Sequence, residues 1–215
     1  DAIIHPLVPG EPYPDKGLCG AAVGFKLVQG LLRKYARKNA TLPDGQTFEG
    51  FEKWMLDLVA IASIGDMVPL LGESRTLTRY GLTVINKTRN VGLKKLLIVA
   101  GMADENGNSK RGIYDSYNMS FQIIPRINAA GRMDHANAAF ALLMATDEKT
   151  AEDLASQLNK NNTDRQKITE QYVSEARRQI KETGQKDNPV LFVVGPGWPT
   201  GILGLISGKI KDDYY

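Results

Sequence analysis

The sequence has few of the residues that build metal centres and covalent cross-links. Its 215 residues include one cysteine, Cys19, and two histidines, His5 and His135. A single cysteine excludes an internal disulfide and a CxxC zinc site, and two histidines exclude a site that needs three. Cys19 lies in a run of small and apolar residues, which favours a buried thiol over a reactive one. Asp134-His135 resembles half of a metal pair, but no acidic cluster surrounds it.

Long apolar runs are also missing. No stretch approaches the roughly 20 residues needed to cross a bilayer, and no segment resembles a signal peptide. We therefore expect a cytoplasmic protein with no membrane partner. A hydrophobic content of 42%, a charged content of 24% and a net charge of +3 are typical of a globular chain. This charge permits a polyanionic partner without requiring one.

Hydrophobic spacing predicts a chain rich in helices, with a strand near each end. The strands are expected over residues 1–6 and 189–194. The polar run 161–164 interrupts the apolar stripe of the longest predicted helix and could bend or divide it. Gly184 is expected to end that helix. Helices are predicted over 17–38, 51–64, 73–87, 91–100, 136–146, 147–183 and 202–211.

This pattern favours an α/β fold with two domains. We expect a mostly helical part over 1–146, a connecting helix within 147–188, and the start of an α/β domain over 189–215. At about 1.5 Å per residue, a helix over 147–183 would be roughly 50 Å long, enough to connect two domains. The chain begins inside a predicted strand and stops, at residues 212–215, in the middle of a helical pattern. We therefore expect both ends to lie within longer elements.

Asp66 follows the most apolar segment of the sequence and precedes Met67-Val68-Pro69. A carboxylate delivered by an apolar element is costly unless it is hydrogen-bonded, paired or bound to a metal. The local pattern favours an aspartate that caps its own turn or the next helix. A metal ligand is the alternative.

Two arginines and an amide lie in the run Pro125–Met133. Arg126 and Arg132 are separated by small residues and by Asn128. Planar guanidinium groups donate paired hydrogen bonds to phosphate oxygens, and small residues let a ligand approach the backbone. The same arginines could instead pair with acidic residues at a domain junction. The residues alone leave both interpretations open.

A third motif, over 190–211, has the pattern of a strand, a glycine-rich turn and a helix. Gly195, Gly197 and Gly201 could bring backbone N–H groups and a helix N-terminus toward an anion. Their spacing matches neither the Walker phosphate loop nor GxGxxG. A tight connection with Trp198 packed on it explains the pattern equally well.

Taken in order, these segments resemble the RecJ family of 5′-to-3′ single-stranded-DNA exonucleases, within the DHH phosphoesterase superfamily. Four runs carry the resemblance along nearly the whole chain, and the most specific is Pro-Arg-Ile-Asn-Ala-Ala-Gly-Arg. Trp198 with Gly201 and Gly204 comes next. The matching runs are Leu18–Leu27, Ile64–Leu70, Pro125–Met133 and Gly197–Ser207.

The resemblance implies that residues 1–146 form the C-terminal part of a DHH catalytic domain and that 189–215 begin a DHHA1 domain. It also implies two divalent ions, Mn²⁺ or Mg²⁺, with Asp66 as a catalytic residue and the last metal ligand. The other ligands would precede Asp1. The implied DNA-binding residues are Arg126, Asn128 and Arg132 on the backbone near the scissile phosphate, and Gly197, Trp198 and Gly201 at the start of the DHHA1 surface.

The implied reaction is two-metal hydrolysis of phosphodiester bonds in single-stranded DNA, in DNA repair and recombination. A single-strand-binding protein or a helicase is an expected partner. One carboxylate cannot hold two ions, so the chain alone is expected to be inactive. Pro199 stands where many relatives have histidine, so any role of that histidine is absent. Two alternatives stay open: a DHH-type phosphodiesterase for short oligonucleotides or cyclic dinucleotides, and a non-catalytic nucleic-acid-binding module.

Overall fold

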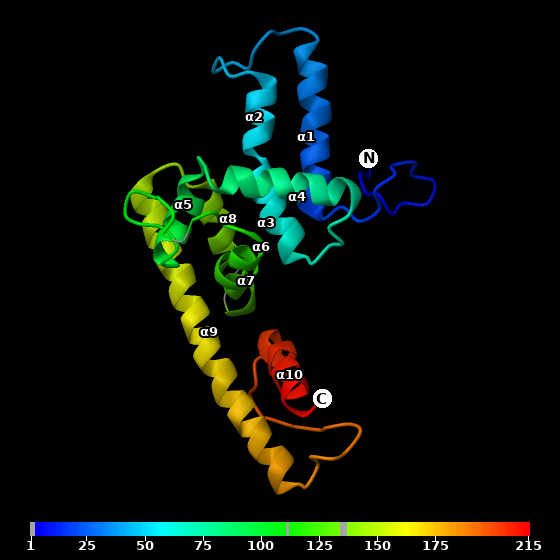
Figure 1. Ribbon diagram of the computed structural model, residues 1–215, viewed down its shortest axis with the longest axis vertical. Helices are drawn as coiled ribbons and strands as arrows, with labels where there is room; N and C mark the ends of the chain where they lie inside the picture. Colours follow the sequence, from blue (N-terminus) through cyan, green and yellow to red (C-terminus); the bar gives the residue numbers. More distant parts are fainter. Residues whose placement is uncertain (1–2, 111, 134–136) are drawn as a thin grey trace. The chain divides into compact units, whose positions relative to one another are not determined.

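The computed structural model describes residues 3–110, 112–133 and 137–215, and these are mainly helical (Figure 1). The chain divides into two compact units, Asp1–Ile124 and Pro125–Tyr215. No helix among the described residues is long and apolar enough to span a bilayer. The elements are α1 Gly20–Ala36, α2 Phe48–Trp54, α3 Leu56–Gly65, α4 Gly72–Ile85, α5 Val91–Val99, α6 Ser116–Asn118, the π-helical turn η1 Met119–Ile123, α7 Ile124–Met133, α8 Asn137–Met144, α9 Glu148–Glu182 and α10 Thr200–Tyr214.

The first unit is built around α3. This helix is apolar on nearly all sides, as expected of a buried helix, and it packs against α1 and most extensively against α4 (Figure 1). α3 and α4 approach each other closely at Gly81 of α4, where an added Cβ would lie 2.2 Å from the carbonyl oxygen of Leu56. The prediction of a single helix over 51–64 is wrong in one respect. The backbone turns at Met55, so α2 and α3 are separate helices.

The second unit is built around α9, which confirms the long helix predicted over 147–183. Asp147 caps its start by accepting a hydrogen bond from the Thr150 amide at 2.8 Å. Gly184 ends it with a positive φ of 67°, and Gln185 N donates to Ile180 O at 3.0 Å. The C-terminal half packs against α10 through apolar residues of both helices (Figure 1): Val173, Ala176, Ile180, Ile202, Ile206 and Ile210. The break that the polar run 161–164 could have caused does not occur, since α9 is one helix.

The predicted strands are not formed in the part of the chain that the structure describes. Residues 3–6 and 189–194 are irregular, and the one β-bridge among the described residues joins Ala103 to Ser109. Residues 1 and 2 of the first predicted strand lie outside the described residues. The α/β prediction is therefore corrected to a mainly helical fold here.

Side chains take the place of a neighbouring strand along 189–194. The Gln185 amide exchanges two hydrogen bonds with the backbone of Phe192, at 2.7 and 2.9 Å. The Gln179 amide does the same with Val194, at 2.9 and 3.1 Å. A strand is defined by backbone partners, which a sequence pattern cannot supply. The alternation of apolar residues therefore indicated an extended segment correctly but not a sheet.

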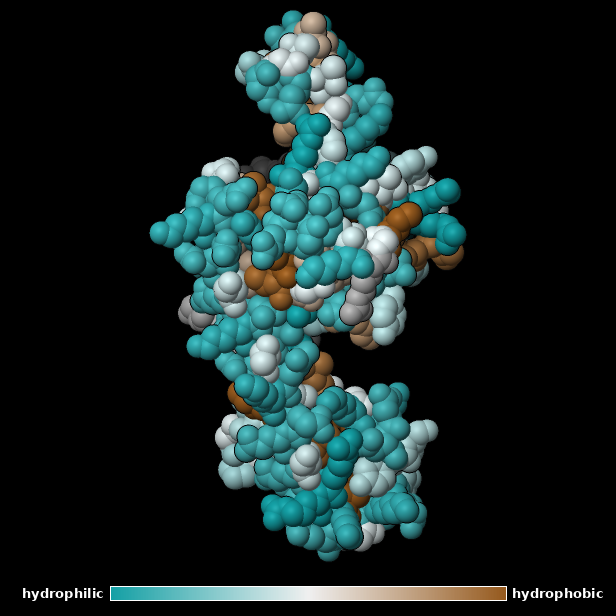
Figure 2. All heavy atoms as spheres, turned by 60° about the vertical axis from the view of Figure 1, so that its left-hand side comes forward, coloured by the Kyte–Doolittle hydropathy of each residue, from teal (hydrophilic) through white to brown (hydrophobic). Residues whose placement is uncertain are grey.

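The two compact units meet at Ile124–Pro125, earlier in the chain than the expected boundary within 147–188. The division into 1–146, 147–188 and 189–215 stays a prediction. Hydrophilic residues cover most of the face seen in Figure 2, and apolar residues form small, separate areas on it.

Candidate functional site

Asp66 is the C-cap residue of α3, and its side chain is exposed. The helix ends in a tight turn, in which Met67 N donates to Ile64 O at 3.1 Å and Val68 N donates to Ser63 O at 3.2 Å. Met67 has a left-handed backbone, with φ of 53°. Glycine usually occupies this position, because a side chain costs about 1–2 kcal/mol there. The strained turn stops α3 directly after Asp66 and leaves its carboxylate at the helix end.

The Asp66 carboxylate has no hydrogen bond or ion pair within residues 3–110, 112–133 and 137–215. It does not cap the next helix, whose N-cap is Leu71 without a side-chain bond. A carboxylate at a helix C-terminus also faces the negative end of the helix dipole, which is unfavourable. Within the part of the chain that the structure describes, the capping interpretation is therefore wrong, and no side chain there occupies the Asp66 carboxylate. Among the described residues, no three His, Cys, Asp or Glu side chains come together.

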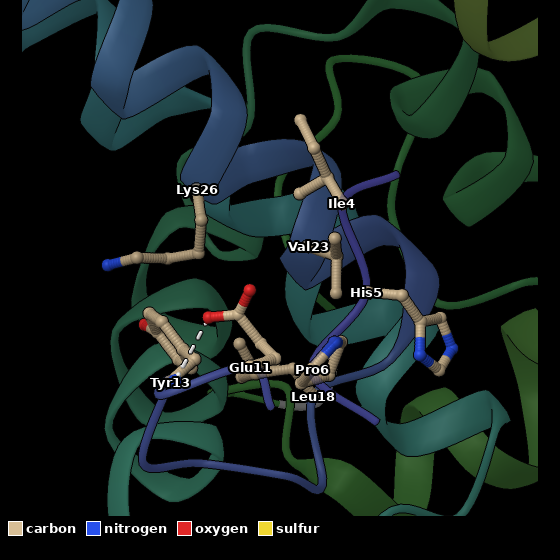
Figure 3. A pocket seen from close by; sticks show the side chains of 8 residues that line it. All are labelled: Ile4, His5, Pro6, Glu11, Tyr13, Leu18, Val23 and Lys26. Atoms are coloured by element: carbon tan, nitrogen blue, oxygen red, sulfur yellow. Dashed lines mark hydrogen bonds between the residues drawn. The ribbon is translucent and has the colours of Figure 1, made fainter. Parts of the chain in front are cut away.

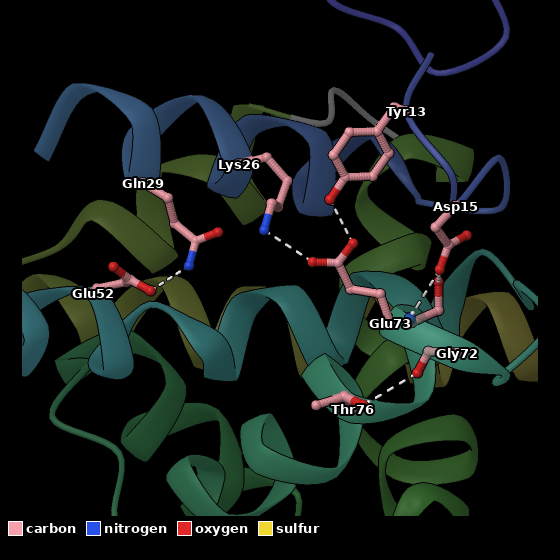
Figure 4. A network of polar contacts seen from close by, with 9 residues as sticks. Tyr13, Asp15, Lys26, Gln29, Glu52, Gly72, Glu73 and Thr76 are labelled. Atoms are coloured by element: carbon pink, nitrogen blue, oxygen red, sulfur yellow. Dashed lines mark hydrogen bonds and ion pairs between the residues drawn. The ribbon is translucent and has the colours of Figure 1, made fainter. Parts of the chain in front are cut away.

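The segment after Asp66 is anchored where it enters α4 (Figure 4). Asp15 accepts a hydrogen bond from the Ser74 amide at 3.2 Å and so caps α4 from a distant part of the chain. Glu73 accepts hydrogen bonds from the Tyr13 hydroxyl at 2.5 Å and from Lys26 Nζ at 2.8 Å. Both carboxylates lie at the N-terminus of α4, where the dipole stabilises negative charge. The loop that follows Asp66 is therefore held at both of its ends.

A small cavity lies beside this network, between the N-terminal segment and α1 (Figure 3). It measures about 90 Å³, and most of its lining is apolar, including Ile4, Pro6, Leu18 and Val23. This volume is far below the roughly 300–1,000 Å³ of a typical ligand pocket. The cavity therefore belongs to the packing of the first unit.

The Glu73 network makes the stability of the first unit dependent on pH. Burial acts to raise the pKa of Glu73, but hydrogen bonds from Lys26 and Tyr13 lower it overall. Burial and the bond to Glu73 raise the pKa of Tyr13 to about 12. Glu73 thus stabilises the fold above its unfolded pKa of about 4.3, and this stabilisation is lost as the pH falls through the lower folded value. The Tyr13 contribution is lost as the pH rises from about 10 toward 12.

Replacing Glu73 by glutamine is expected to lower the free energy of unfolding by about 1–2 kcal/mol at pH 7. The difference from the unsubstituted chain should shrink at pH 3, because the pH has then fallen below the unfolded pKa of Glu73 toward its lower folded pKa. Urea denaturation at the two pH values measures this. Glu49→Gln, at the exposed pair with Lys53, is the matched control and should change stability less. An equal effect of both substitutions would show that the Glu73 network is not stabilising.

Arg126 lies in the first turn of α7, which continues a helical run that starts at α6. Asp115 and Asn118 cap this run with reciprocal hydrogen bonds of 2.9 and 3.2 Å. The π-helical turn η1 directly precedes α7, and Pro125 is the second residue of α7. A proline inside an ordinary helix removes a donor and clashes with the preceding turn, whereas a π-helical turn is wider. The sequence therefore keeps a helix through a residue that normally ends one.

The three polar residues of this motif do not share one side of α7. Arg126 is partly buried, and its Nε donates to Asn159 Oδ1 of α9 at 2.9 Å. Burial holds the pKa of Arg126 below its ordinary value. Asn128 is exposed and lies about 200° further round the helix. Arg132 belongs to the last turn, and its side chain lies outside the described part of the structure, as do Asp134 and His135.

The glycine-rich turn before α10 is used to pack Trp198. Trp198 N donates to Gly195 O at 3.3 Å across a turn with Gly197 at φ 80°. The indole contacts the Tyr172 ring at 5.3 Å between centroids, and its Nε1 donates to Glu175 at 3.3 Å. The geometry thus supports the packing interpretation for Trp198. Gly201 is exposed in the first turn of α10.

Two further polar residues, Asn159 and Asp57, make contacts in the fold that were not predicted from the sequence. Asn159 binds Arg126, and Asp57 is 4% exposed and accepts a hydrogen bond from the Thr88 hydroxyl at 2.6 Å. Burial raises the pKa of Asp57. Asp57 interrupts the apolar stretch of the helix predicted over 51–64, which is a signal for a buried polar contact, whereas Asn159 lies in a polar stretch and gives no such signal. Their partners lie 31 and 33 residues away, so the contacts themselves could not be read from local pattern.

No protein-family profile matches the chain. Over 214 residues the whole chain is 35% identical to the single-stranded-DNA-specific exonuclease RecJ of Bacillus subtilis, of which it covers 24%. It is 32% identical over 218 residues to the RecJ of Haemophilus influenzae, of which it covers 36%. The chain is homologous to a segment of RecJ. It thus spans about a quarter to a third of the length of these curated relatives.

The fold agrees with this relationship. A crystal structure of RecJ from Thermus thermophilus in complex with Mg²⁺ matches 98% of the chain with a TM-score of 0.74 and 27% identity, and 30% of that protein is covered. A structure of exonuclease RecJ bound to manganese matches 83% of the chain with a TM-score of 0.61 and 25% identity. The resemblance predicted from the four motifs is confirmed. The metals bound in these RecJ structures, Mg²⁺ and manganese, are the ones that the resemblance implied.

Proposed function

We propose that this chain is a segment of a single-stranded-DNA exonuclease and that Asp66 is a ligand of one of its two divalent ions. The observation that supports this most directly is the exposed Asp66 carboxylate, which a strained turn holds at the end of α3 with no partner among the described residues. Strain and an unfavourable charge position are kept where function needs them. Mg²⁺ and Mn²⁺ prefer such oxygen ligands.

In this proposal, the ions would activate a water molecule and stabilise the charge that develops on the phosphate. Arg126, Asn128 and Arg132 would bind the DNA backbone. Gly197 and Gly201, also in the second unit, would lie near the same DNA strand. Arg126 supplies a charged donor held by α9, while Asn128 is exposed for hydrogen bonding. We further propose 5′-to-3′ polarity and a place in DNA repair and recombination. A single-strand-binding protein or a helicase would be the protein partner.

The chain alone should bind single-stranded DNA without cutting it. We expect tighter binding to a single strand than to a duplex, and affinity that falls steeply with salt because cations on the protein bind phosphates. Arg126→Ala should weaken binding about 10-fold, whereas Lys186→Ala, which removes an exposed cation elsewhere in the second unit, should not. Fluorescence anisotropy with a labelled strand measures the affinities.

Hydrolysis is tested with the same chain and Mn²⁺. Release of nucleotides from a labelled strand by the purified chain would contradict the prediction that the metal site of this chain is incomplete. Binding without preference for single strands, together with no effect of Arg126→Ala, would contradict the proposed function itself. Cleavage of dinucleotides but not of long strands, by the longer protein that carries this segment, would instead favour a phosphodiesterase for short oligonucleotides.

A further inference from the structure

The outer side of α4 carries cations, an aromatic ring and uncharged residues. The inner side of this helix packs against α3 (Figure 1). Its exposed residues fall within an arc of about 140° around the helix, since successive residues are about 100° apart. We call this surface the outer α4 face. It consists of Gly72, Arg75, Thr76, Arg79, Tyr80 and Thr83.

No acid is paired with the two arginines of this face. Among the described residues, neither Arg75 nor Arg79 makes an ion pair or a side-chain hydrogen bond. The one acid in the sequence of α4, Glu73, is paired with Lys26 at 2.8 Å. Like charges four residues apart on a helix repel each other, and Arg75 also lies near the positive end of the helix dipole. Binding of an anion would relieve both effects.

The spacing of the two arginines suits a phosphate backbone. The backbones of Arg75 and Arg79 are about 6 Å apart along the helix axis, so their side chains are neighbours on its surface. A planar guanidinium group donates paired hydrogen bonds to phosphate oxygens. Because both side chains are exposed, each guanidinium can turn toward a phosphate. The pair can therefore bind successive phosphates of one strand.

Tyr80 favours a nucleic acid over other anionic partners. Its side chain is 60% exposed and directly follows Arg79 on the outer α4 face. Proteins that bind single strands combine cations for the phosphates with aromatic rings on which the bases stack. An acidic peptide would need only the cations, and a duplex keeps the faces of its bases stacked inside. A single strand therefore uses all three side chains.

We propose that the outer α4 face binds single-stranded DNA, with Arg75 and Arg79 on successive phosphates and Tyr80 stacked on a base. The first unit then has a DNA-binding surface of its own, in addition to the residues proposed in α7. This inference rests on the proposed function in the choice of ligand, a single DNA strand. The residues that carry it are different, so each can fail without the other.

Arg75→Gln and Arg79→Gln each remove one charge and keep a side chain that favours a helix. Each should weaken binding of a labelled oligothymidine strand about 3- to 10-fold. The slope of log affinity against log salt should become shallower by about 0.7, because the protein then neutralises one phosphate fewer. Arg33→Gln is the matched control, since Arg33 is an exposed cation of α1 without a partner among the described residues. It should change neither affinity nor slope in fluorescence anisotropy.

Tyr80→Ala tests the stacking separately. It should weaken binding about 5-fold or more and leave the salt slope unchanged, because no charge is lost. Tyr80→Phe keeps the ring and should bind like the unsubstituted chain. An abasic strand has phosphates but no bases, so Tyr80→Ala should have no effect on its binding. Weaker binding that accompanies a lower unfolding temperature would indicate a role in folding and would contradict the inference.

The outcomes separate this inference from the proposed function. If the substitutions on the outer α4 face leave affinity unchanged while Arg126→Ala weakens it, the inference is overturned and the proposed function stands. If Arg33→Gln changes affinity and slope as much as Arg79→Gln, only net charge matters and the inference is again overturned. Weaker binding of polyglutamate but not of DNA would assign the face to an acidic protein instead. If the face variants weaken DNA binding but Arg126→Ala does not, the inference stands and the proposed role of Arg126 fails.

Discussion

Asp66→Asn is expected to abolish Mn²⁺-dependent hydrolysis by the protein that carries this segment, and at the same time to stabilise the fold. A divalent ion supplies several kcal/mol of transition-state stabilisation, so loss of a ligand should reduce the rate by about 10³-fold or more. The same change removes a negative charge from the C-terminus of α3, which should raise the free energy of unfolding by about 0.3–1 kcal/mol. Opposite signs for activity and stability are the signature of a functional carboxylate.

Release of nucleotides from a labelled strand and urea denaturation measure the two effects. Glu105→Gln is the control, since Glu105 is an exposed acid elsewhere in the first unit. It should change neither activity nor stability. Loss of stability in Asp66→Asn with full activity would mean that Asp66 caps its turn, and the metal-ligand proposal would have to be withdrawn.

Gly81→Ala is expected to destabilise the first unit by about 3 kcal/mol, although alanine is the better helix former. In an open helix this substitution stabilises by about 1 kcal/mol. At Gly81 the new methyl group would lie 2.2 Å from the Leu56 carbonyl oxygen and 2.5 Å from the Ala60 Cβ. Relief of these contacts requires α3 and α4 to move apart, and overpacking of this kind costs about 1–3 kcal/mol, more against backbone.

Gly30→Ala is the matched control. Gly30 lies in α1, and an added Cβ there meets nothing within 4 Å. This variant should be more stable by about 0.5–1 kcal/mol. Thermal unfolding of the two variants and the unsubstituted chain provides the measurement. A Gly81→Ala variant as stable as Gly30→Ala would show that α3 and α4 are not closely packed at this point.

The helices could be predicted because their signals are local. The apolar spacing of 147–183 and the terminal Gly184 act within one or two turns, and the structure confirms both of them. The strand over 189–194 could not be predicted reliably, because strand pairing is decided by what lies beside the segment. There, the side-chain amides of Gln179 and Gln185, and not a neighbouring strand, form the hydrogen bonds to the backbone of the extended segment.

The position of the strained residue was also beyond local pattern. Gly65 was the obvious residue for the turn after α3, yet the left-handed residue is Met67. Gly65 stays in the helix, where an added Cβ would lie 3.4 Å from the Ile124 side chain. The turn therefore places its strained residue two positions after the glycine. Sequence alone shows only that a glycine is nearby.

By itself, the sequence determined the relationship to RecJ, the order of the helices and the candidate residues Asp66, Arg126 and Asn128. These depend on residue identity and on spacing within a few turns, which the chain carries in its linear order. Only the tertiary structure decided that Asp66 caps neither its own turn nor α4 among the described residues, and that Asn159 accepts a hydrogen bond from Arg126. The reason is physical: burial, charge compensation and hydrogen bonding between distant segments depend on which side chains the fold brings together.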